Sequence, residues 1–484
     1  MRHAPGLARL ARGAAAAHYR RMRADPQPAP YRADPRILRL AGWIGDPVAG
    51  ADFPQTTLRF RSDAHAATVG LAELDDDAWC AHFGRFAALP GNLPQPLALR
   101  YHGHQFRVYN PEIGDGRGFL FAQLRDGQAK GGGRLLDFGT KGSGQTPWSR
   151  QGDGRLTLKG AVREILATAM LEAQGVNTSK TFSVIETGEE LFRGDEPSPT
   201  RSAVLVRLSH GHIRIGTFQR LAALGEREHM AELVDYCLET YPGPEAGESR
   251  AAALLHQVVE RLADLAASYM ASGFVHGVLN SDNMNISGES FDYGPWRWAP
   301  AWDAGFTAAY FDHAGLYAFG RQPEALHWNC GQLAVSLRLL SETAPLVAAL
   351  ERFAELYRAN LARRFTWRLG LRSRGEEADL AVVVAAEKAM RESGVGVDDF
   401  FFRHRGGRRA QGELAVALAG YEGEAAHPYW DEPEPQSLLI DEVEAIWAAI
   451  AERDDWVPLK AKLAALERMG QALGEPPVPA GHRA

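Results

Sequence analysis

The segment that decides the fold reads His276-Gly-Val-Leu-Asn280-Ser-Asp282-Asn283, and Asp292-Tyr-Gly294 follows shortly after it. Apolar residues at three- and four-residue spacing predict a long helix over 251–272, ended by Gly273 directly before this segment. We interpret the segment as a functional loop placed by that helix. The alternative is a polar loop whose side chains only cap a helix.

The spacing within the loop matches the catalytic loop of protein kinases, H-R-D-x-x-x-x-N followed by D-F-G. Asn283 stands seven residues after His276, and Asp292 takes the place of the D-F-G aspartate. Amide and carboxylate oxygens suit Mg²⁺, so we predict that Asn283 and Asp292 bind Mg²⁺ or Mn²⁺. The kinase base is missing, because that position is Val278, which cannot accept a proton. The nearest replacement is Asp282.

Three glycine-rich stretches, each with a basic residue, lie upstream within about 40 residues of one another. Any one of them could be a hairpin turn. Together they favour phosphate binding, because glycine lets backbone N–H groups approach phosphate oxygens while Arg or Lys supplies charge. The stretches are Gly114-Asp-Gly116-Arg-Gly118, Lys141-Gly-Ser-Gly144 and Gly152-Asp-Gly154-Arg155.

Other charged residues follow the order expected of a kinase-like site. Lys141 ends an apolar run that predicts a strand, and Glu164 lies in a predicted helix over 157–173. We expect an ion pair between them, although an unrelated pair of surface charges is the alternative. Arg207 and Arg214, seven residues apart, could reach the same phosphates from a strand or its edge.

Composition excludes several classes of protein. The net charge of 53 − 60 = −7 gives no reason to bind nucleic acid or an anionic membrane, and no apolar run is long enough to span a bilayer. The basic stretch at 403–409 is interpreted as a solvated or phosphate-facing loop. Three cysteines without a CxxC pair favour a reducing compartment, so we expect a cytoplasmic protein.

The chain of 484 residues divides into four parts by pattern. We expect an Arg/Ala/Pro-rich flexible segment at 1–37, a β-rich nucleotide-binding lobe at 38–215, a helical lobe with the catalytic loop at 216–345, and a helical extension with a frayed tail at 346–484. The fold class is therefore α+β. Residues 1–36 resemble a transit peptide in composition, and an untidy terminal extension is the alternative.

Many longer motifs, in order, resemble the SelO (selenoprotein O-like) family of pseudokinases. They are Tyr101-His-Gly-His-Gln-Phe106, Asn110-Pro111, Gly114-Asp-Gly-Arg117, Lys141-Gly-Ser-Gly144, Arg150, Gly152-Asp-Gly-Arg155, the loop 276–283, Asp292-Tyr-Gly-Pro295 and Tyr317-Ala-Phe-Gly320. The resemblance covers about 38–340. It departs from the family in the tail, where no cysteine follows Cys330, so redox control through a C-terminal motif is in doubt.

The resemblance implies a bilobal protein-kinase-like fold that binds ATP in an inverted orientation. It implies transfer of AMP to Ser, Thr or Tyr hydroxyls of proteins, with release of pyrophosphate. Metal on Asn283 and Asp292, Asp282 as proton acceptor and Glu164 orienting Lys141 are implied as well. The residues implied to bind ATP are Gly114, Gly116, Arg117, Lys141, Asp153, Gly154, Arg207 and Arg214.

Two other functions stay open at this point. An ordinary kinase would use the same residue types to transfer the γ-phosphate. A noncatalytic ATP-binding scaffold would explain Val278 at the position of the kinase base. The sequence does not identify protein targets, nucleotide orientation or oligomeric state.

Overall fold

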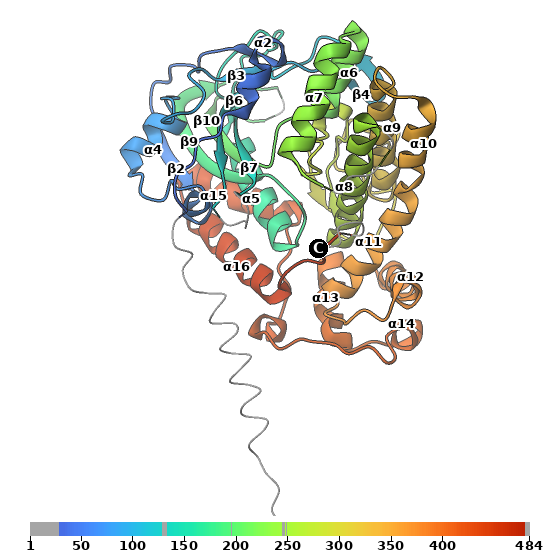
Figure 1. Cartoon of the computed structure of the whole chain (residues 1–484). Helices are drawn as coiled ribbons and strands as arrows, with labels where there is room; N and C mark the ends of the chain where they lie inside the picture. The colour runs from blue at the N-terminus through green and yellow to red at the C-terminus, as the bar shows by residue number, and fades with distance from the viewer. Residues whose placement is uncertain (1–28, 128–132, 195, 244–246, 248, 480–484) are drawn as a thin grey trace, which may run out of the picture.

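The computed structural model describes residues 29–127, 133–194, 196–243, 247 and 249–479. Most of the predicted N-terminal segment, residues 1–28, lies outside this part. The described chain is α+β, with a β-rich sheet in its first half and helices after it (Figure 1). The predicted fold class is confirmed at this level. In the described residues no helix is long and apolar enough to cross a membrane.

Eight strands of the described chain form one sheet in the order β1-β3-β6-β7-β10-β9-β2, with β8 beside β10. Every pair in it is antiparallel. The strands are β1 (Gly45–Pro47), β2 (Thr57–Arg61), β3 (Leu97–Leu99), β6 (Leu120–Arg125), β7 (Leu135–Lys141), β8 (Leu156–Thr157), β9 (Lys180–Leu191) and β10 (Thr200–Ser209). Two separate pairs are β4 (Gly103–Gln105) with β5 (Val108–Asn110), and β11 (Phe274–Val275) with β12 (Arg297–Trp298).

The other regular elements of the described chain are helices. The α-helices are α2 (Ala41–Ile44), α3 (Asp63–Thr68), α4 (Asp76–Phe83), α5 (Leu158–Ala173), α6 (Ile215–Leu224), α7 (Arg227–Thr240), α8 (Arg250–Ser272), α9 (Gln322–Leu337), α10 (Thr343–Glu351), α11 (Phe353–Arg368), α12 (Glu376–Ser393), α13 (Val397–His404), α14 (Gly412–Ala417), α15 (Ile440–Arg453) and α16 (Val457–Leu473). The 3₁₀ helices are η1 (Arg36–Leu40), η2 (Ser281–Asn283), η3 (Phe319–Arg321), η4 (Arg405–Gly407) and η5 (Pro428–Asp431). The helices predicted over 157–173 and 251–272 are confirmed to within one residue, and Gly273 ends α8 in the left-handed conformation that glycine adopts without strain.

The two faces of the sheet have different neighbours because side chains alternate along each strand. Phe138 of β7 packs into an aromatic core with Phe182 of β9 and Phe83 of α4. Lys141, three residues later, points to the opposite face, where α5 lies. The antiparallel register pairs Arg207 of β10 with Gly139 of β7. Arg207 therefore shares the face of Lys141.

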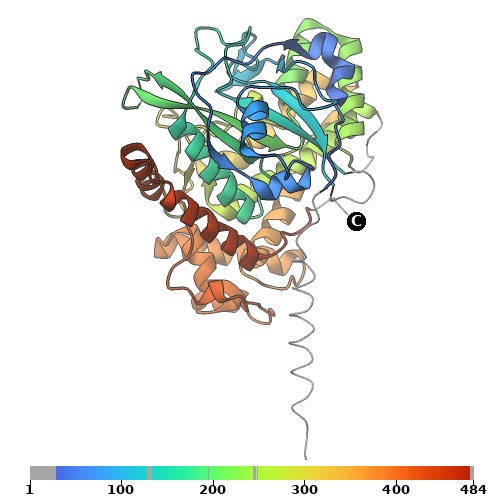
Figure 2. The same cartoon turned by 90° about the vertical axis from the view of Figure 1, so that its left-hand side faces the viewer.

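The C-terminal helices pack back onto α5. Lys159 of α5 forms an ion pair with Glu444 of α15 at 2.7 Å, and Gly470 of α16 lies against Ala173 at the end of α5. In Figure 2 the two red helices run beneath the sheet. Residues 474–479 of the predicted frayed tail follow α16, and the Val478 carbonyl accepts a 2.8 Å hydrogen bond from Arg363. Residues 480–484 lie outside the described part.

The aromatic core gives a direct test of the fold. Phe138 is fully buried between Phe83 and Phe182. We expect Phe138→Ala to lower the free energy of unfolding by about 3–5 kcal/mol, because it removes a large side chain and leaves a cavity. Urea denaturation measures this. The exposed Val416→Ala is the matched control and should change stability by less than about 0.5 kcal/mol. Equal changes in both variants would contradict this packing.

Candidate active site

A pocket of about 730 Å³ lies where the sheet meets the loop that follows α8. Its wall contains eleven of the residues singled out from the sequence, and the twelfth, Glu164, lies behind Lys141. The eleven are Gly114, Gly116, Arg117, Lys141, Asp153, Gly154, Arg207, Arg214, Asp282, Asn283 and Asp292. The fold thus brings residues from seven separate stretches of sequence to one cavity.

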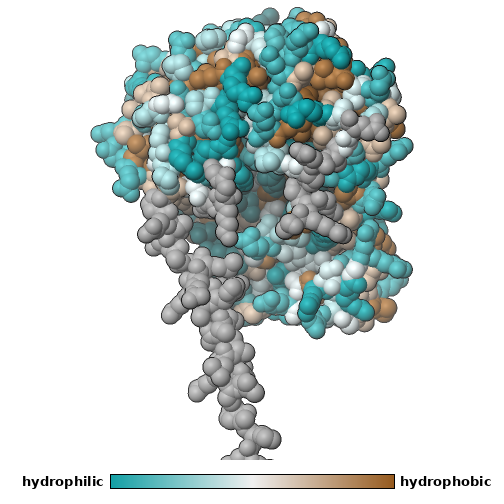
Figure 3. All heavy atoms as spheres, in the orientation of Figure 1, coloured by the Kyte–Doolittle hydropathy of each residue, from teal (hydrophilic) through white to brown (hydrophobic). Residues whose placement is uncertain are grey.

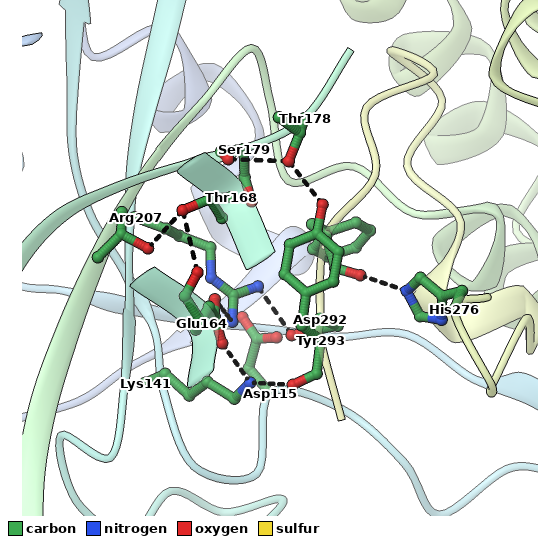
Figure 4. A network of polar contacts seen from close by, with 12 residues as sticks. Asp115, Lys141, Glu164, Thr168, Thr178, Ser179, Arg207, His276, Asp292 and Tyr293 are labelled. Atoms are coloured by element: carbon green, nitrogen blue, oxygen red, sulfur yellow. Dashed lines mark hydrogen bonds and ion pairs between the residues drawn. The ribbon is translucent and has the colours of Figure 1, made fainter. Parts of the chain in front are cut away.

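Lys141 and Glu164 form a buried ion pair in the wall of this pocket (Figure 4). The Lys141 Nζ lies 2.7 Å from Glu164 Oε2 and 3.4 Å from the Tyr293 carbonyl oxygen. Burial lowers the pKa of Lys141, and the carboxylate of Glu164 opposes that shift. The pair holds the ammonium group at the end of β7, so Lys141 is fixed in place for a bound anion.

Two arginines form ion pairs with Asp292. Its Oδ1 accepts a 2.7 Å hydrogen bond from Arg207, and its Oδ2 accepts a 2.6 Å hydrogen bond from Arg214. Burial alone would raise the pKa of Asp292, but these guanidinium groups and Lys141 hold it well below its usual range. The Asp292 backbone has φ of 59°, which is strained for a residue other than glycine. The ion pairs stabilise this backbone.

The sequence analysis overlooked Asp115, which completes the charge network. Asp115 is buried, and its Oδ1 lies 3.1 Å from Arg214 Nη2. Its Oδ2 accepts a 3.1 Å hydrogen bond from the Leu99 amide. An acid between two glycines, Gly114 and Gly116, was the available signal, but only the glycines and the arginine of that stretch were selected.

Asn283 and Asp292 have the right donor atoms for a divalent cation. Asn283 Nδ2 donates a 3.0 Å hydrogen bond to the Val278 carbonyl. Its amide is therefore oriented with Oδ1 available to the pocket that the side chain lines. Asp292 keeps further lone pairs beside its two arginine contacts. An amide and a carboxylate oxygen fit Mg²⁺ or Mn²⁺, which retain several water ligands.

Asp282 is the carboxylate of the loop that has no cationic partner at its side chain. Burial raises its pKa to about 6, and in the described part of the chain its Oδ1 accepts no hydrogen bond. Gln105 of β4 donates weakly toward this carboxylate and lowers its pKa in part. The orientation of the Gln105 amide is set by Asn110 Nδ2, which donates to Gln105 Oε1 at 3.0 Å. A carboxyl group with a pKa close to neutral is suited to proton transfer.

The β4–β5 hairpin anchors the loop, a role that the sequence analysis did not foresee for it. The amide of His104 donates to Ser281 Oγ at 2.7 Å, and the amide of Phe106 donates to Asn280 Oδ1 at 2.9 Å. Gly103 allows the close approach, because a Cβ there would lie 3.0 Å from Asp282 Oδ1. These contacts hold Asp282 at the edge of the pocket. In the sequence, the motif Tyr101–Phe106 indicated a role for this hairpin only through the family resemblance.

The glycine-rich stretches form another part of the pocket wall. Gly154 has φ of 68°, and a Cβ there would lie 2.1 Å from the Gly144 carbonyl oxygen, so the two loops touch through their backbones. Asp153 forms a 2.8 Å ion pair with Arg193 at the mouth. Arg117 is exposed there and has no acidic partner in the described residues. This wall can surround a nucleotide closely.

Other candidate groups have structural contacts. His102 Nδ1 lies 2.6 Å from the Tyr109 hydroxyl, and His104 Nδ1 accepts a 2.6 Å hydrogen bond from Gln219. The described residues contain no cluster of three or more His, Cys, Asp or Glu side chains that could bind a metal. Cys237 and Cys330 are buried, and burial raises their pKa values, so neither is an activated thiolate.

Comparison with known proteins decides the family. The family described as "Protein adenylyltransferase SelO" matches residues 31–417. The chain belongs to the SelO family. "Protein nucleotidyltransferase YdiU" of Synechococcus elongatus is 41% identical over 472 residues, covering 90% of this chain and 94% of that protein. The proteins of the same name from Gloeobacter violaceus and Pseudomonas putida are 42% identical (88% and 92% coverage) and 38% identical (69% and 67%).

The buried carboxylate of Asp282 predicts a pH-dependent stability. Its pKa of about 6 in the folded chain exceeds the ordinary value of 3.8, so the unfolded chain releases this proton at lower pH and the fold loses stability as pH rises from about 4 to about 6. We expect the free energy of unfolding of Asp282→Asn to exceed that of the parent by about 3 kcal/mol at pH 8, and this difference to vanish near about pH 3, where the Asp282 carboxyl of the parent is protonated in both the folded and the unfolded chain. Urea denaturation with EDTA and without nucleotide measures it. A difference that stays constant with pH would contradict the assignment.

Proposed function

We propose that this SelO-family enzyme transfers AMP from ATP to a Ser, Thr or Tyr hydroxyl of a protein. The hydroxyl oxygen attacks the α-phosphorus, the bond from that phosphorus to the bridging oxygen breaks, and pyrophosphate leaves. The hydroxyl proton passes to Asp282. The buried position and raised pKa of Asp282 support this role, and Val278 cannot supply it.

The observation that carries the proposal is the charge at the closed end of the pocket. Arg207 on β10 and Arg214 before α6 lie on either side of the connection 210–213 between sheet and helices, and both are buried. Lys141 lies beside them. These cations are already buried against carboxylates, so an adenine ring there would offer them no anionic partner, whereas β- and γ-phosphates would pair with them. This supports an inverted nucleotide, with its α-phosphate toward Asp282.

Asn283 and Asp292 would hold the divalent cation, Mg²⁺ or Mn²⁺. When bound, it supplies charge neutralisation for the phosphates. Lys141, positioned by Glu164, and the two arginines stabilise negative charge on the leaving pyrophosphate. Gly114, Gly116, Arg117, Asp153 and Gly154 surround the rest of the nucleotide.

We assign this chemistry to a bilobal kinase-like arrangement. The sheet part at 38–215 is the nucleotide-binding lobe, 216–345 is the lobe with the metal site, and 346–484 is the extension. Two features support it: the α5 glutamate paired with the strand lysine, and the loop 276–283 that follows the long helix α8.

Labelled ATP tests the reaction. With Mg²⁺ or Mn²⁺ and cell extract, we expect label from the α-position, and none from the γ-position, on protein. Asp282→Ala should lower transfer at least about 100-fold while ATP binding stays within about twofold, because it removes the proton acceptor alone. Autoradiography and calorimetry measure the two quantities. Label from the γ-position would identify a kinase, and binding without any transfer would identify a scaffold.

The orientation of the nucleotide has its own test. Arg207→Met should weaken ATP binding about 10- to 100-fold but AMP binding much less, because Arg207 would contact the terminal phosphates. Arg201→Met is the matched control on the same strand, since Arg201 pairs with Glu186 and Asp454 outside the pocket. Calorimetric titration of ATP, ADP and AMP measures the series. Equal losses for ATP and AMP would contradict the inverted orientation.

A further inference from the structure

Exposed apolar side chains lie on and next to the β4–β5 hairpin, whose Gln105 lines the pocket together with Asp282. Tyr310 is 82% exposed, Val108 is 69% exposed and Phe311 is 42% exposed. Phe106 joins the hairpin to the other two aromatic residues, since its ring lies 5.8 Å from that of Phe311, and the Phe311 ring lies 5.1 Å from that of Tyr310. Val108 lies two residues after Phe106 and pairs with Gln105 across the hairpin. We call Phe106, Val108, Tyr310 and Phe311 the acceptor surface. They come from the β4–β5 hairpin and from the loop between β12 and α9.

The hairpin turn holds one half of this surface under backbone strain. Gln105 pairs with Val108, so Phe106 and Arg107 are the two turn residues, and both have positive φ, 50° and 63°. Asn and Gly are the residues that such a turn favours. A phenylalanine occupies this strained position, and its ring lies 5.1 Å from that of Tyr317 and 5.8 Å from that of Phe311.

The same hairpin connects the acceptor surface to the proposed base. Val108 shares its face of the hairpin with its cross-strand partner Gln105, which donates toward Asp282. The Phe106 amide donates to Asn280 in the catalytic loop, and the Tyr317 hydroxyl donates to the same Asn280 oxygen at 2.7 Å. The surface is therefore fixed relative to Asp282 from two directions.

Charged side chains border the acceptor surface. Arg107 forms a 2.8 Å ion pair with Glu324 and lies over the Trp328 ring, 5.4 Å from its centroid. Glu324 pairs with Arg321 as well, at 3.1 Å. An apolar centre with a polar rim is the usual anatomy of a protein-binding surface. On the face of the molecule that Figure 3 shows, brown side chains form small groups separated by hydrophilic ones.

We propose that the acceptor surface binds the polypeptide that receives AMP, as an extended segment with an apolar or aromatic side chain near its hydroxyl residue. The proposal rests on the proposed function. A protein hydroxyl that reaches Asp282 must bring its flanking residues past the hairpin that carries Gln105, where Val108 is exposed and Phe106 leads to Phe311 and Tyr310. Burial of Val108, Phe106, Tyr310 and Phe311 against an apolar side chain would supply affinity, while the charged rim would set direction.

A peptide array tests this surface. Each peptide carries one Ser, Thr or Tyr, and its neighbours are varied among Phe, Leu, Gly, Asp and Lys. With α-labelled ATP and Mg²⁺ we expect the parent enzyme to favour peptides with Phe or Leu near the hydroxyl at least fivefold. The double variant Val108→Ser, Tyr310→Ala should lose this preference, and its KM for such a peptide should rise about tenfold with ATP affinity unchanged. Val416→Ser, at a valine that is 76% exposed elsewhere, should behave as the parent does.

Each other outcome identifies what is wrong. If the parent labels peptides without an apolar preference, or the double variant keeps that preference, the acceptor surface is overturned while AMP transfer stands. If the parent binds ATP but labels no peptide and no protein in extract, the proposed function is overturned and this inference with it. If sedimentation shows a dimer that the double variant dissociates, a second copy of the chain occupies the surface, and the proposal is overturned in favour of that copy.

Discussion

The structure depends on mutual neutralisation of buried charge. Lys141, Arg207 and Arg214 face Glu164, Asp292 and Asp115, so three cations meet three carboxylates at the closed end of one pocket. Removing any one partner would leave an unpaired charge in a poorly solvated place. This arrangement depends on the strand register, on the position of α5 and on the strained backbone of Asp292.

That balance bears on how the proposed nucleotide would bind. Its phosphate oxygens would replace carboxylate oxygens around the guanidinium groups, and Asp292 would then be available to help hold a divalent cation. The buried cations would thus exchange one kind of anionic oxygen, that of a carboxylate, for another, that of a phosphate. A pocket with unpaired cations would bind phosphate more strongly but would destabilise the fold.

The sequence could predict much of this site because its residues lie in short stretches with fixed spacing. The order of Lys141, Glu164, Asn283 and Asp292 along the chain, with their element types, was enough to expect them around one cavity. Asp115 and Gln105 could not be found this way. Their roles depend on partners 99 and 177 residues away (214 − 115 and 282 − 105), which only the sheet register and the placement of the hairpin bring near. The aromatic core around Phe138 likewise joins elements whose contacts no local pattern reveals.

The last helices, α15 and α16, support the pocket although they lie far from its residues in the sequence. Every residue that lines the pocket lies before residue 296. Yet α5, which carries Glu164, is held from outside by α15 and α16 through Lys159–Glu444 and the contact of Ala173 with Gly470. A chain that ended near residue 430 would contain every residue of the pocket wall but would lack the helices that hold α5 in place. The helix α5 and the C-terminal helices therefore form one structural unit, and removing the C-terminal helices would also disturb the helix that carries Glu164.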